Sequence, residues 1–322
     1  MGRRRDRRRR RRRSLRHGGG ARGDAASPGT LPLTKRRGVL GGKTVAVALG
    51  GGGARGLAHI SVLQALDDMG VRPVAMAGTS IGAIIGAAYA AGFSGAELRA
   101  HTEAILSNRL GLARKLLYAR ARRRQPLLTR LAHPLLFDGV RFLDAFWPEG
   151  MPERFEDLDI PMTVVATDFR RRCEAVFSKG SLRTAIAGSM AIPGVVRPPK
   201  SELGYLVDGG LVNPLPYDHL QGKADIIVAV NVSGNSGMES ETRAPSPFQT
   251  MIVATQILMN SISSRMIEEN PPDVLLAPGV HQYLALDLFK ASRIFTAGDA
   301  CRDKLREGLL KAAERLEPQR RD

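Results

Sequence analysis

The chain has 322 residues, a formal net charge of +17 and 43% hydrophobic residues. This length and apolar content suffice for a large globular domain, and the most apolar run, Ile81 to Ala91, is too short to span a bilayer. The two cysteines, Cys173 and Cys301, match neither a disulfide framework nor the spacing of metal ligands, which is typical of a reducing, cytoplasmic compartment.

The positive charge is concentrated at the start of the chain. Residues 1–40 contain fifteen Lys and Arg against Asp6 and Asp24, a net charge of +13, so the other 282 residues carry only +4. Because this segment has few apolar residues to bury, we expect a disordered, Arg-rich tail, and it lacks the apolar stretch of a secretory signal. The tail has three interpretations: peripheral contact with the anionic inner face of a membrane, binding of nucleic acid, or a solvated extension without function.

Beyond the tail, short apolar strands alternate with helices. The predicted strands cover residues 44–49, 73–78, 160–169 and 224–233. The predicted helices cover 57–70, 81–91, a segment opened by the capping box of Ser94 and Glu97, and 291–316. Buried strands separated by helices indicate an α/β fold with a mostly parallel sheet covered on both faces. We expect residues 43–235 to form the core and 236–322 to complete the same domain with helices and strands.

A glycine-rich loop, GGGARG at 51–56, connects the first strand to the first helix. Gly51, Gly53 and Gly56 satisfy the dinucleotide-binding pattern GxGxxG, but no acidic residue follows about twenty positions later to hold a ribose. The segment GGKT at 41–44 resembles the end of a phosphate-binding loop, yet it precedes a strand instead of following one. Neither nucleotide-binding interpretation fits its context.

The next loop has the pattern of a nucleophile elbow. Gly78-Thr79-Ser80-Ile81-Gly82 is a GxSxG motif between a predicted strand and a predicted helix, where a sharp turn exposes the serine hydroxyl. Adjacent parallel strands would bring this elbow and the glycine loop to the same crevice. Glycine N–H groups can approach the oxygen of a tetrahedral intermediate closely, so we predict an oxyanion hole at Gly51, Gly52 and Gly53, with Arg55 bracing the loop.

A serine nucleophile needs a general base, and the sequence offers two kinds. His219 and His281 come late enough for a conventional triad, but neither sits in a recognisable turn after a strand. Asp208 follows the apolar YLV and precedes Gly209-Gly210, so it ends a strand where the backbone turns sharply. We favour Asp208 as the base, with an ordinary Asp-Gly turn as the alternative.

Three motifs in this order, GGGARG, GTSIG and DGG, resemble the patatin-like phospholipase family, as do PMTVVATDF and AIAGSMAIPGVVRP before LVDGGLVNPLP. The resemblance runs from about Val45 to Asn231, and it implies a three-layer α/β/α sandwich with a mostly parallel central sheet. It also implies a Ser–Asp dyad of Ser80 and Asp208, with Gly51 to Gly53 as the oxyanion hole. The supporting motif positions are Ala54, Arg55, Gly56, Gly78, Thr79, Ile81, Gly82, Gly209 and Gly210. One departure is Gly188-Ser189, where the family usually has Ala-Ser.

The resemblance implies a serine hydrolase of the phospholipase A or lysophospholipase kind, which cleaves acyl esters of lipids without a cofactor or metal. A non-lipid carboxylesterase or thioesterase would use the same residues. A regulatory protein of this fold, whose basic tail binds nucleic acid or a partner, is the alternative from another class. A second basic segment, Arg109 to Arg130, has eight Lys or Arg and no acid, which would suit an anionic surface.

Overall fold

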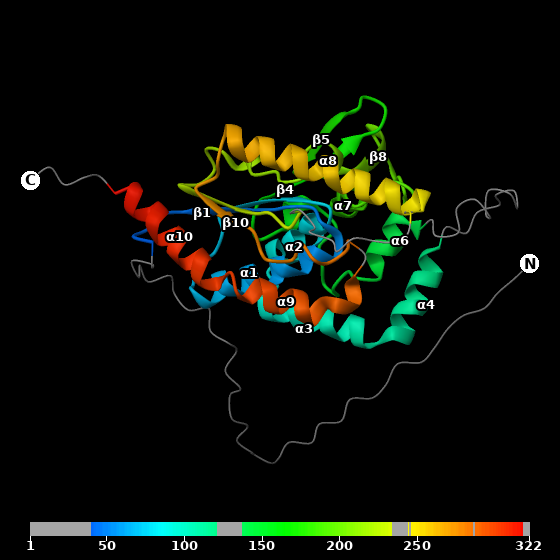
Figure 1. Ribbon diagram of the computed structural model, residues 1–322, viewed down its shortest axis with the longest axis horizontal. Coiled ribbons are helices and arrows are strands. Elements are labelled where there is room, and N and C mark those ends of the chain that lie inside the picture. The colour runs from blue at the N-terminus through cyan, green and yellow to red at the C-terminus, as the bar shows by residue number, and fades with distance from the viewer. Residues whose placement is uncertain (1–39, 121–136, 234–243, 245, 286, 318–322) are drawn as a thin grey trace, which may run out of the picture. The chain divides into compact units, whose positions relative to one another are not determined.

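The computed structural model describes residues 40–120, 137–233, 244, 246–285 and 287–317. The predicted tail and the second half of the basic segment at 109–130 lie outside these residues. Figure 1 shows the described elements around a central sheet. No helix in these ranges is both long and apolar enough to cross a membrane.

The central sheet is mostly parallel, as predicted. Its order is β10-β9-β1-β2-β4-β8-β7, with β5 also paired to β4. The parallel strands are β1 (Val45–Leu49), β2 (Ala75–Thr79), β4 (Met162–Asp168), β9 (Ile226–Val230) and β10 (Val274–Leu276). The antiparallel strands are β5 (Cys173–Phe177), β7 (Lys200–Ser201) and β8 (Gly204–Asp208). A separate small sheet pairs β3 (Phe137–Asp138) with β6 (Val196–Arg197).

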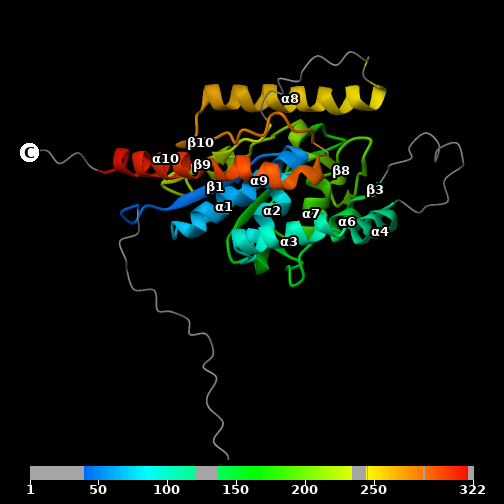
Figure 2. The same cartoon turned by 60° about the horizontal axis from the view of Figure 1, so that its bottom comes forward.

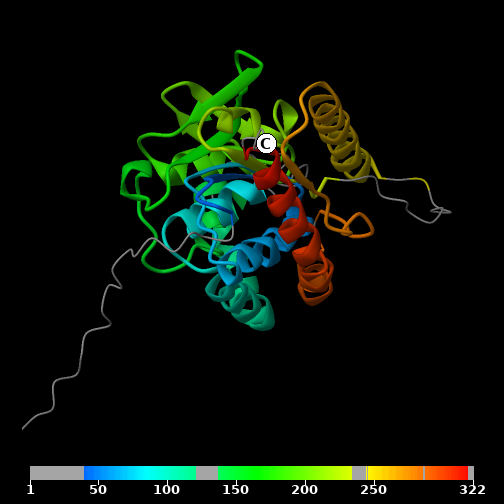
Figure 3. The same cartoon turned by 90° about the vertical axis from the view of Figure 1, so that its left-hand side faces the viewer.

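Helices cover both faces of the sheet. The α-helices are α1 (Ala58–Asp68), α2 (Ile81–Ala90), α3 (Gly95–Ser107), α4 (Arg109–Ala119), α6 (Gly139–Asp144), α7 (Leu182–Ser189), α8 (Pro247–Glu269), α9 (Ala291–Asp299) and α10 (Arg302–Arg315). Figures 2 and 3 show α8 on one side of the sheet and α1 and α3 on the other. The described part of the chain is therefore the predicted three-layer α/β/α sandwich.

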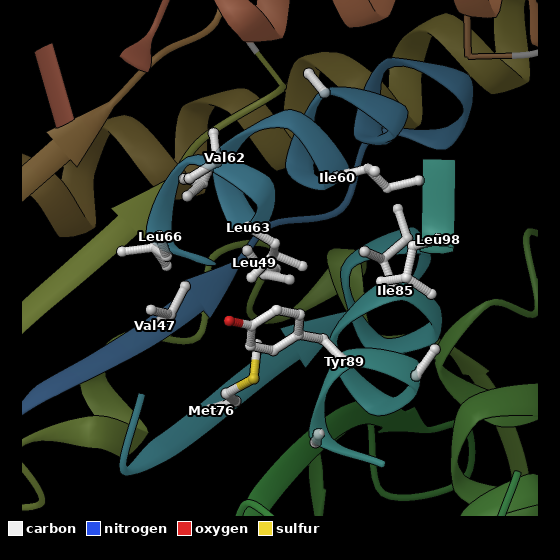
Figure 4. Close-up of a cluster of buried hydrophobic side chains, with 14 of the residues drawn as sticks. Val47, Leu49, Ile60, Val62, Leu63, Leu66, Met76, Ile85, Tyr89 and Leu98 are labelled. Atoms are coloured by element: carbon white, nitrogen blue, oxygen red, sulfur yellow. The ribbon is translucent and has the colours of Figure 1, made fainter. Parts of the chain in front are cut away.

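Alternation along the strands explains the two unequal faces. In β1, Val45, Val47 and Leu49 belong to the main core, and Figure 4 shows Val47 and Leu49 among residues of α1 and α2. Ala46 and Ala48 of the same strand point to the opposite face, together with Leu215 and Tyr217. Successive side chains of a strand point to opposite faces. The alternation of large residues and alanines in β1 therefore places the large residues on one face of the sheet and the alanines on the other. The small face lets the loop after Asp208 pack closely on the sheet.

The predicted local signals are found with one exception. Ser94 and Glu97 form the predicted capping box at the start of α3. The single helix predicted over 291–316 is wrong, because α9 and α10 are separate helices with a break at Ala300 and Cys301. The two helices contact different elements: Gly298 of α9 packs on Ser61 of α1, whereas Gly308 of α10 packs on Val274 of β10. Glycine near the end of α9 also weakens helix continuation.

Candidate active site

Ser80 stands at a strained turn between β2 and α2. Its backbone has φ 54° and ψ −121°, a conformation that costs a non-glycine residue free energy and is typical of functional sites. The turn is so tight that a Cβ on Gly82 would collide with the carbonyl group of Leu49. Ser80 is therefore held as the predicted nucleophile elbow, with its side chain at the carboxyl end of β2.

The pairing pattern of β4 brings a second strand end to this turn. β4 pairs with β2 through Met162 to Val165 and with β8 through Ala166 to Asp168. β5 overlaps both stretches of β4, so it occupies the other edge of that strand. β2 and the antiparallel β8 thus share one edge of β4 and meet end to end. Their last residues are Thr79, directly before Ser80, and Asp208.

Ser80 and Asp208 are in direct contact. The Ser80 hydroxyl donates a hydrogen bond of 2.8 Å to Asp208 Oδ2, and both residues are only 4% exposed. The Gly210 N–H donates to Asp208 Oδ1 at 2.8 Å, and the Thr167 hydroxyl donates to the Asp208 carbonyl oxygen at 2.8 Å. These bonds leave the carboxylate oriented toward the serine.

Burial changes the basicity of this carboxyl. Loss of solvation raises the pKa of Asp208 to about 6, although hydrogen bonds from Gly210 and Ser80 oppose the shift. An aspartate of ordinary pKa is a poor acceptor for a serine proton, and a raised pKa makes it a better one while leaving it ionised at neutral pH.

The glycine loop lies beside the pair, and its amide groups differ in their partners. The Gly51 N–H donates to the Pro214 carbonyl oxygen at 2.9 Å, and the Ala54 N–H donates to Ala285 at 2.7 Å. Within the described residues, the N–H groups of Gly52 and Gly53 have no acceptor. The prediction that Gly51 supplies an oxyanion donor is therefore corrected, since its N–H is already bonded to Pro214, whereas the same role for Gly52 and Gly53 stays a prediction.

Two side chains hold this loop from within the core. Arg55 is buried, and its Nε–H donates to the Gly52 carbonyl oxygen at 3.3 Å, consistent with the predicted bracing role. The Nε2 of His59 lies 2.8 Å from the Gly50 carbonyl oxygen. Burial lowers the pKa of His59 to about 4, so its ring is neutral at pH 7 and Nε2–H is the donor. His59 was not among the predicted site residues.

The two histidines considered as bases lie elsewhere. His219 Nε2 is 2.7 Å from Glu174 Oε1, and this carboxylate raises the pKa of His219. His281 is exposed at the surface. The hydrogen-bond partner of the Ser80 hydroxyl is Asp208 and neither histidine.

Ser189 is a site residue that the sequence interpretation did not assign. Its hydroxyl accepts a 2.8 Å hydrogen bond from the Ser80 N–H and donates to the Val165 carbonyl oxygen at 2.5 Å. Ser189 thus ties the elbow to β4. The departure at Gly188 sits against Leu206, where a Cβ would lie 2.7 Å from that side chain. A signal was present, since this serine lies within one of the stretches that carry the family resemblance.

Two cavities open from Ser80. The larger one is apolar and runs between α2, α3 and α6. It is lined by Ile81, Ile84, Ile85, Ala88, Leu98, Ile105, Leu106, Phe142, Phe146, Met190, Val195 and Leu288, among others. The second lies over the dyad, where Ser80, Asp208, Gly52 and Gly53 face Ile252, Thr255, Gln256 and Met259 of α8.

One group of described residues has donor atoms close enough for a metal ion. Atoms of Glu174, Asp218 and His219 lie within 4.8 Å of one another. The Nδ2 of Asn213 donates to both carboxylates, at 3.0 and 2.9 Å, and His219 bonds Glu174. The members of this group thus satisfy one another as an ion-pair cluster.

Comparisons of the sequence with known proteins agree with the motifs. Residues 47–220 match the model of the patatin-like phospholipase family. An NTE family protein of Mycobacterium tuberculosis is 34% identical over 228 residues, which are 69% of this chain and 59% of that protein. Patatin-like phospholipase domain-containing protein 6 of Homo sapiens is 35% identical over 211 residues, 63% of this chain and 14% of that protein. The chain thus spans about three fifths of the mycobacterial relative's length. The crystal structure of VipD from Legionella pneumophila is similar at a TM-score of 0.42 and 15% identity, covering 82% of this chain and 66% of that one.

Proposed function

Because the chain belongs to the patatin-like phospholipase family, we propose that it hydrolyses acyl esters of lipids with Ser80 as nucleophile and Asp208 as general base. The observation that carries this proposal is the 2.8 Å hydrogen bond between the two side chains, at a buried position open to an apolar cavity. Family membership supports the class of reaction, and the dyad supplies its two reacting groups.

The reaction has two steps. Asp208 takes the Ser80 proton as Oγ attacks the ester carbonyl carbon, and the negative oxygen lies against the Gly52 and Gly53 N–H groups. The C–O bond to the alcohol then breaks, the leaving oxygen takes the proton from Asp208, and an acyl-enzyme forms. A water molecule, deprotonated by Asp208, attacks this ester. Asp208 then returns the proton to Ser80 Oγ as the C–Oγ bond breaks and the fatty acid is released. Loss of one oxyanion donor typically slows such a reaction about a hundredfold or more.

The large cavity supports a lipid as substrate. Its lining is almost wholly aliphatic and aromatic, and it begins at Ser80, where an acyl carbonyl would be attacked. The binding free energy of an alkyl chain there would come from apolar surface removed from water, at about 25 cal/mol per Å². A small polar ester would not use this surface.

The proposal is tested with Ser80→Ala and the surface variant Ser178→Ala as the matched control. Wild type and Ser178→Ala should hydrolyse long-chain phospholipid and lysophospholipid and react covalently with a fluorophosphonate, whereas Ser80→Ala should do neither while keeping its melting temperature. Labelling of Ser80→Ala at the wild-type rate would remove Ser80 from the mechanism. Hydrolysis of acyl thioesters or short soluble esters alone would instead support the esterase or thioesterase alternative.

A further inference from the structure

Helix α8 forms the roof of the candidate active site. Ile252, Thr255, Gln256 and Met259 have the spacing of one helix face, and all four line the cavity over Ser80 and Asp208. Met259 reaches furthest, since a Cβ on Gly210 would lie 2.6 Å from its Cε and one on Gly51 would lie 2.9 Å away. In this arrangement, α8 separates the dyad from solvent.

The opposite face of α8 is exposed, and its outward residues between 253 and 258 are apolar, whereas Ser261 and Ser264 follow further along. Val253, Ile257 and Leu258 are 43%, 60% and 57% exposed. Residues 247–264 include no charged side chain, so the first 18 of the 23 helical residues carry no charge. A helix on the surface of a globular protein normally presents charged or polar residues to water. The uncharged, apolar outer face of α8 marks a contact surface.

The attachment of α8 is uneven along its length. Near its end, the Tyr217 hydroxyl lies 2.6 Å from the Met266 carbonyl oxygen and 2.8 Å from that of Asn270, and Met266 and Ile267 pack against the sheet. At its start, residues 247–250 are all exposed. Met259 and Ser263 are the buried members of the described helix. In the described part of the chain, the first turns are held by side-chain packing alone, with Ile252 on the cluster of Ala191, Val195 and Val196 and with Met251 next to Gly194. The last turns also have the hydrogen bonds from Tyr217, so the first turns are the ones that would leave the dyad.

We infer that α8 is an interfacial lid, whose outer face docks on a lipid surface and thereby uncovers Ser80. This inference rests on the proposed function, since the substrate would be supplied by that surface. A second protein bound over α8 would cover the entrance to the dyad, whereas a lipid surface would deliver substrate to it. The first 18 residues of α8 have no charged side chain that would lose its hydration when the outer face enters a hydrocarbon boundary.

The test compares the full-length wild type with the triple variant Val253→Ser/Ile257→Ser/Leu258→Ser. The matched control is Val176→Ser/Leu203→Ser, which removes apolar side chains that are 45% and 42% exposed on other elements. Vesicles of neutral phosphatidylcholine at high salt are used, so that attraction through the Arg-rich tail is screened. Three quantities are measured: vesicle co-sedimentation, hydrolysis of vesicle lipid against a short soluble ester, and the rate of fluorophosphonate labelling with and without vesicles.

For the triple variant, we expect vesicle binding and vesicle hydrolysis to fall about tenfold or more, because three apolar side chains no longer leave water. Hydrolysis of the soluble ester should stay within about twofold of wild type, because none of the three side chains lines the cavity over Ser80 and Asp208. Vesicles should speed fluorophosphonate labelling of the wild type and of the control, but not of the triple variant.

Unchanged vesicle binding by the triple variant would overturn the inference. Loss of a dimer in light scattering, with vesicle binding retained, would assign the face to a second copy of the chain instead. Failure of the proposed function would give a different result. The wild type would then bind vesicles through α8 and react faster with the fluorophosphonate on them, yet hydrolyse no lipid. That result would support the docking surface and contradict lipid hydrolysis.

Discussion

The hydroxyl of Ser80 lies 2.8 Å from the carboxylate of Asp208, although 128 residues separate them in the chain. Asp208 is the last residue of β8 and Ser80 directly follows the last residue of β2, and the two strands run in opposite directions along one edge of β4. Because β2 and β8 are both hydrogen-bonded to β4 and their carboxyl ends meet there, backbone hydrogen bonds fix the distance between the Ser80 and Asp208 side chains. No long flexible loop is needed to bring them together.

Asp208→Asn should abolish most of the activity, whereas His219→Ala should not. The amide has the shape of the carboxylate but cannot accept the serine proton, so kcat should fall on the order of 10³-fold, within the range for loss of a general base. His219 bonds Glu174 and not Ser80, so kcat of His219→Ala should stay within a few-fold of wild type. Steady-state kinetics on one ester decide this. A collapse of kcat in His219→Ala at unchanged melting temperature would favour a triad.

The pH dependence of kcat/KM should follow ionisation of Asp208. Burial raises the pKa of Asp208 to about 6, and only the ionised form can accept a proton. Activity should therefore be lost as pH falls through 6 and should rise to a plateau above it. A pH–rate profile on a substrate without ionisable groups measures this. Full activity at pH 4.5 would contradict a base of this pKa.

Ser189→Ala should impair the elbow without removing a reacting group. The Ser80 N–H would lose its acceptor, and a buried unsatisfied donor costs about 1–3 kcal/mol of folding stability. Because Ser189 is a positioning residue, we expect a lower melting temperature together with slower fluorophosphonate labelling. Ser181→Ala, an exposed helix-capping serine, is the control that should lower stability without slowing labelling. Equal labelling rates in both variants would limit Ser189 to a structural role.

Gly53→Ala should reduce activity far more than the same substitution does at a glycine of positive φ elsewhere in the chain. Gly53 has φ +60°, and its Cβ position is filled by the backbone and side chain of Ala285, so the loop must shift. We expect kcat to fall about a hundredfold or more as the oxyanion donors move. Gly150→Ala is the matched control, because Gly150 has φ +83° with no atom within 4 Å of an added Cβ. It should cost about 1–2 kcal/mol of stability and leave kcat unchanged. Similar kcat values for the two variants would exclude the loop from the reaction.

Sequence patterns located the parts of the site that depend on neighbours in the chain. The apolar runs predicted β1, β2, β4 and β9, and the pattern around Ser80 predicted a strand–turn–helix elbow, which the backbone adopts. The capping box at Ser94 was predicted for the same reason. Backbone conformation at such sites follows from a few adjacent residues, so their type and spacing suffice. Family membership was also indicated by motif order alone.

The tertiary structure decided which groups meet and which are already bonded. Sequence could not show that β8 runs antiparallel into the end of β2, because strand pairing depends on edges that distant segments share. The Gly51 amide was predicted as an oxyanion donor, but its N–H donates a hydrogen bond to the Pro214 carbonyl oxygen. Ser189 had no predicted role, although its hydroxyl accepts the hydrogen bond from the Ser80 N–H. α8 has little amphipathic pattern because apolar residues lie on both of its faces. Its place over the dyad follows from packing between segments far apart in the chain, which no local pattern encodes.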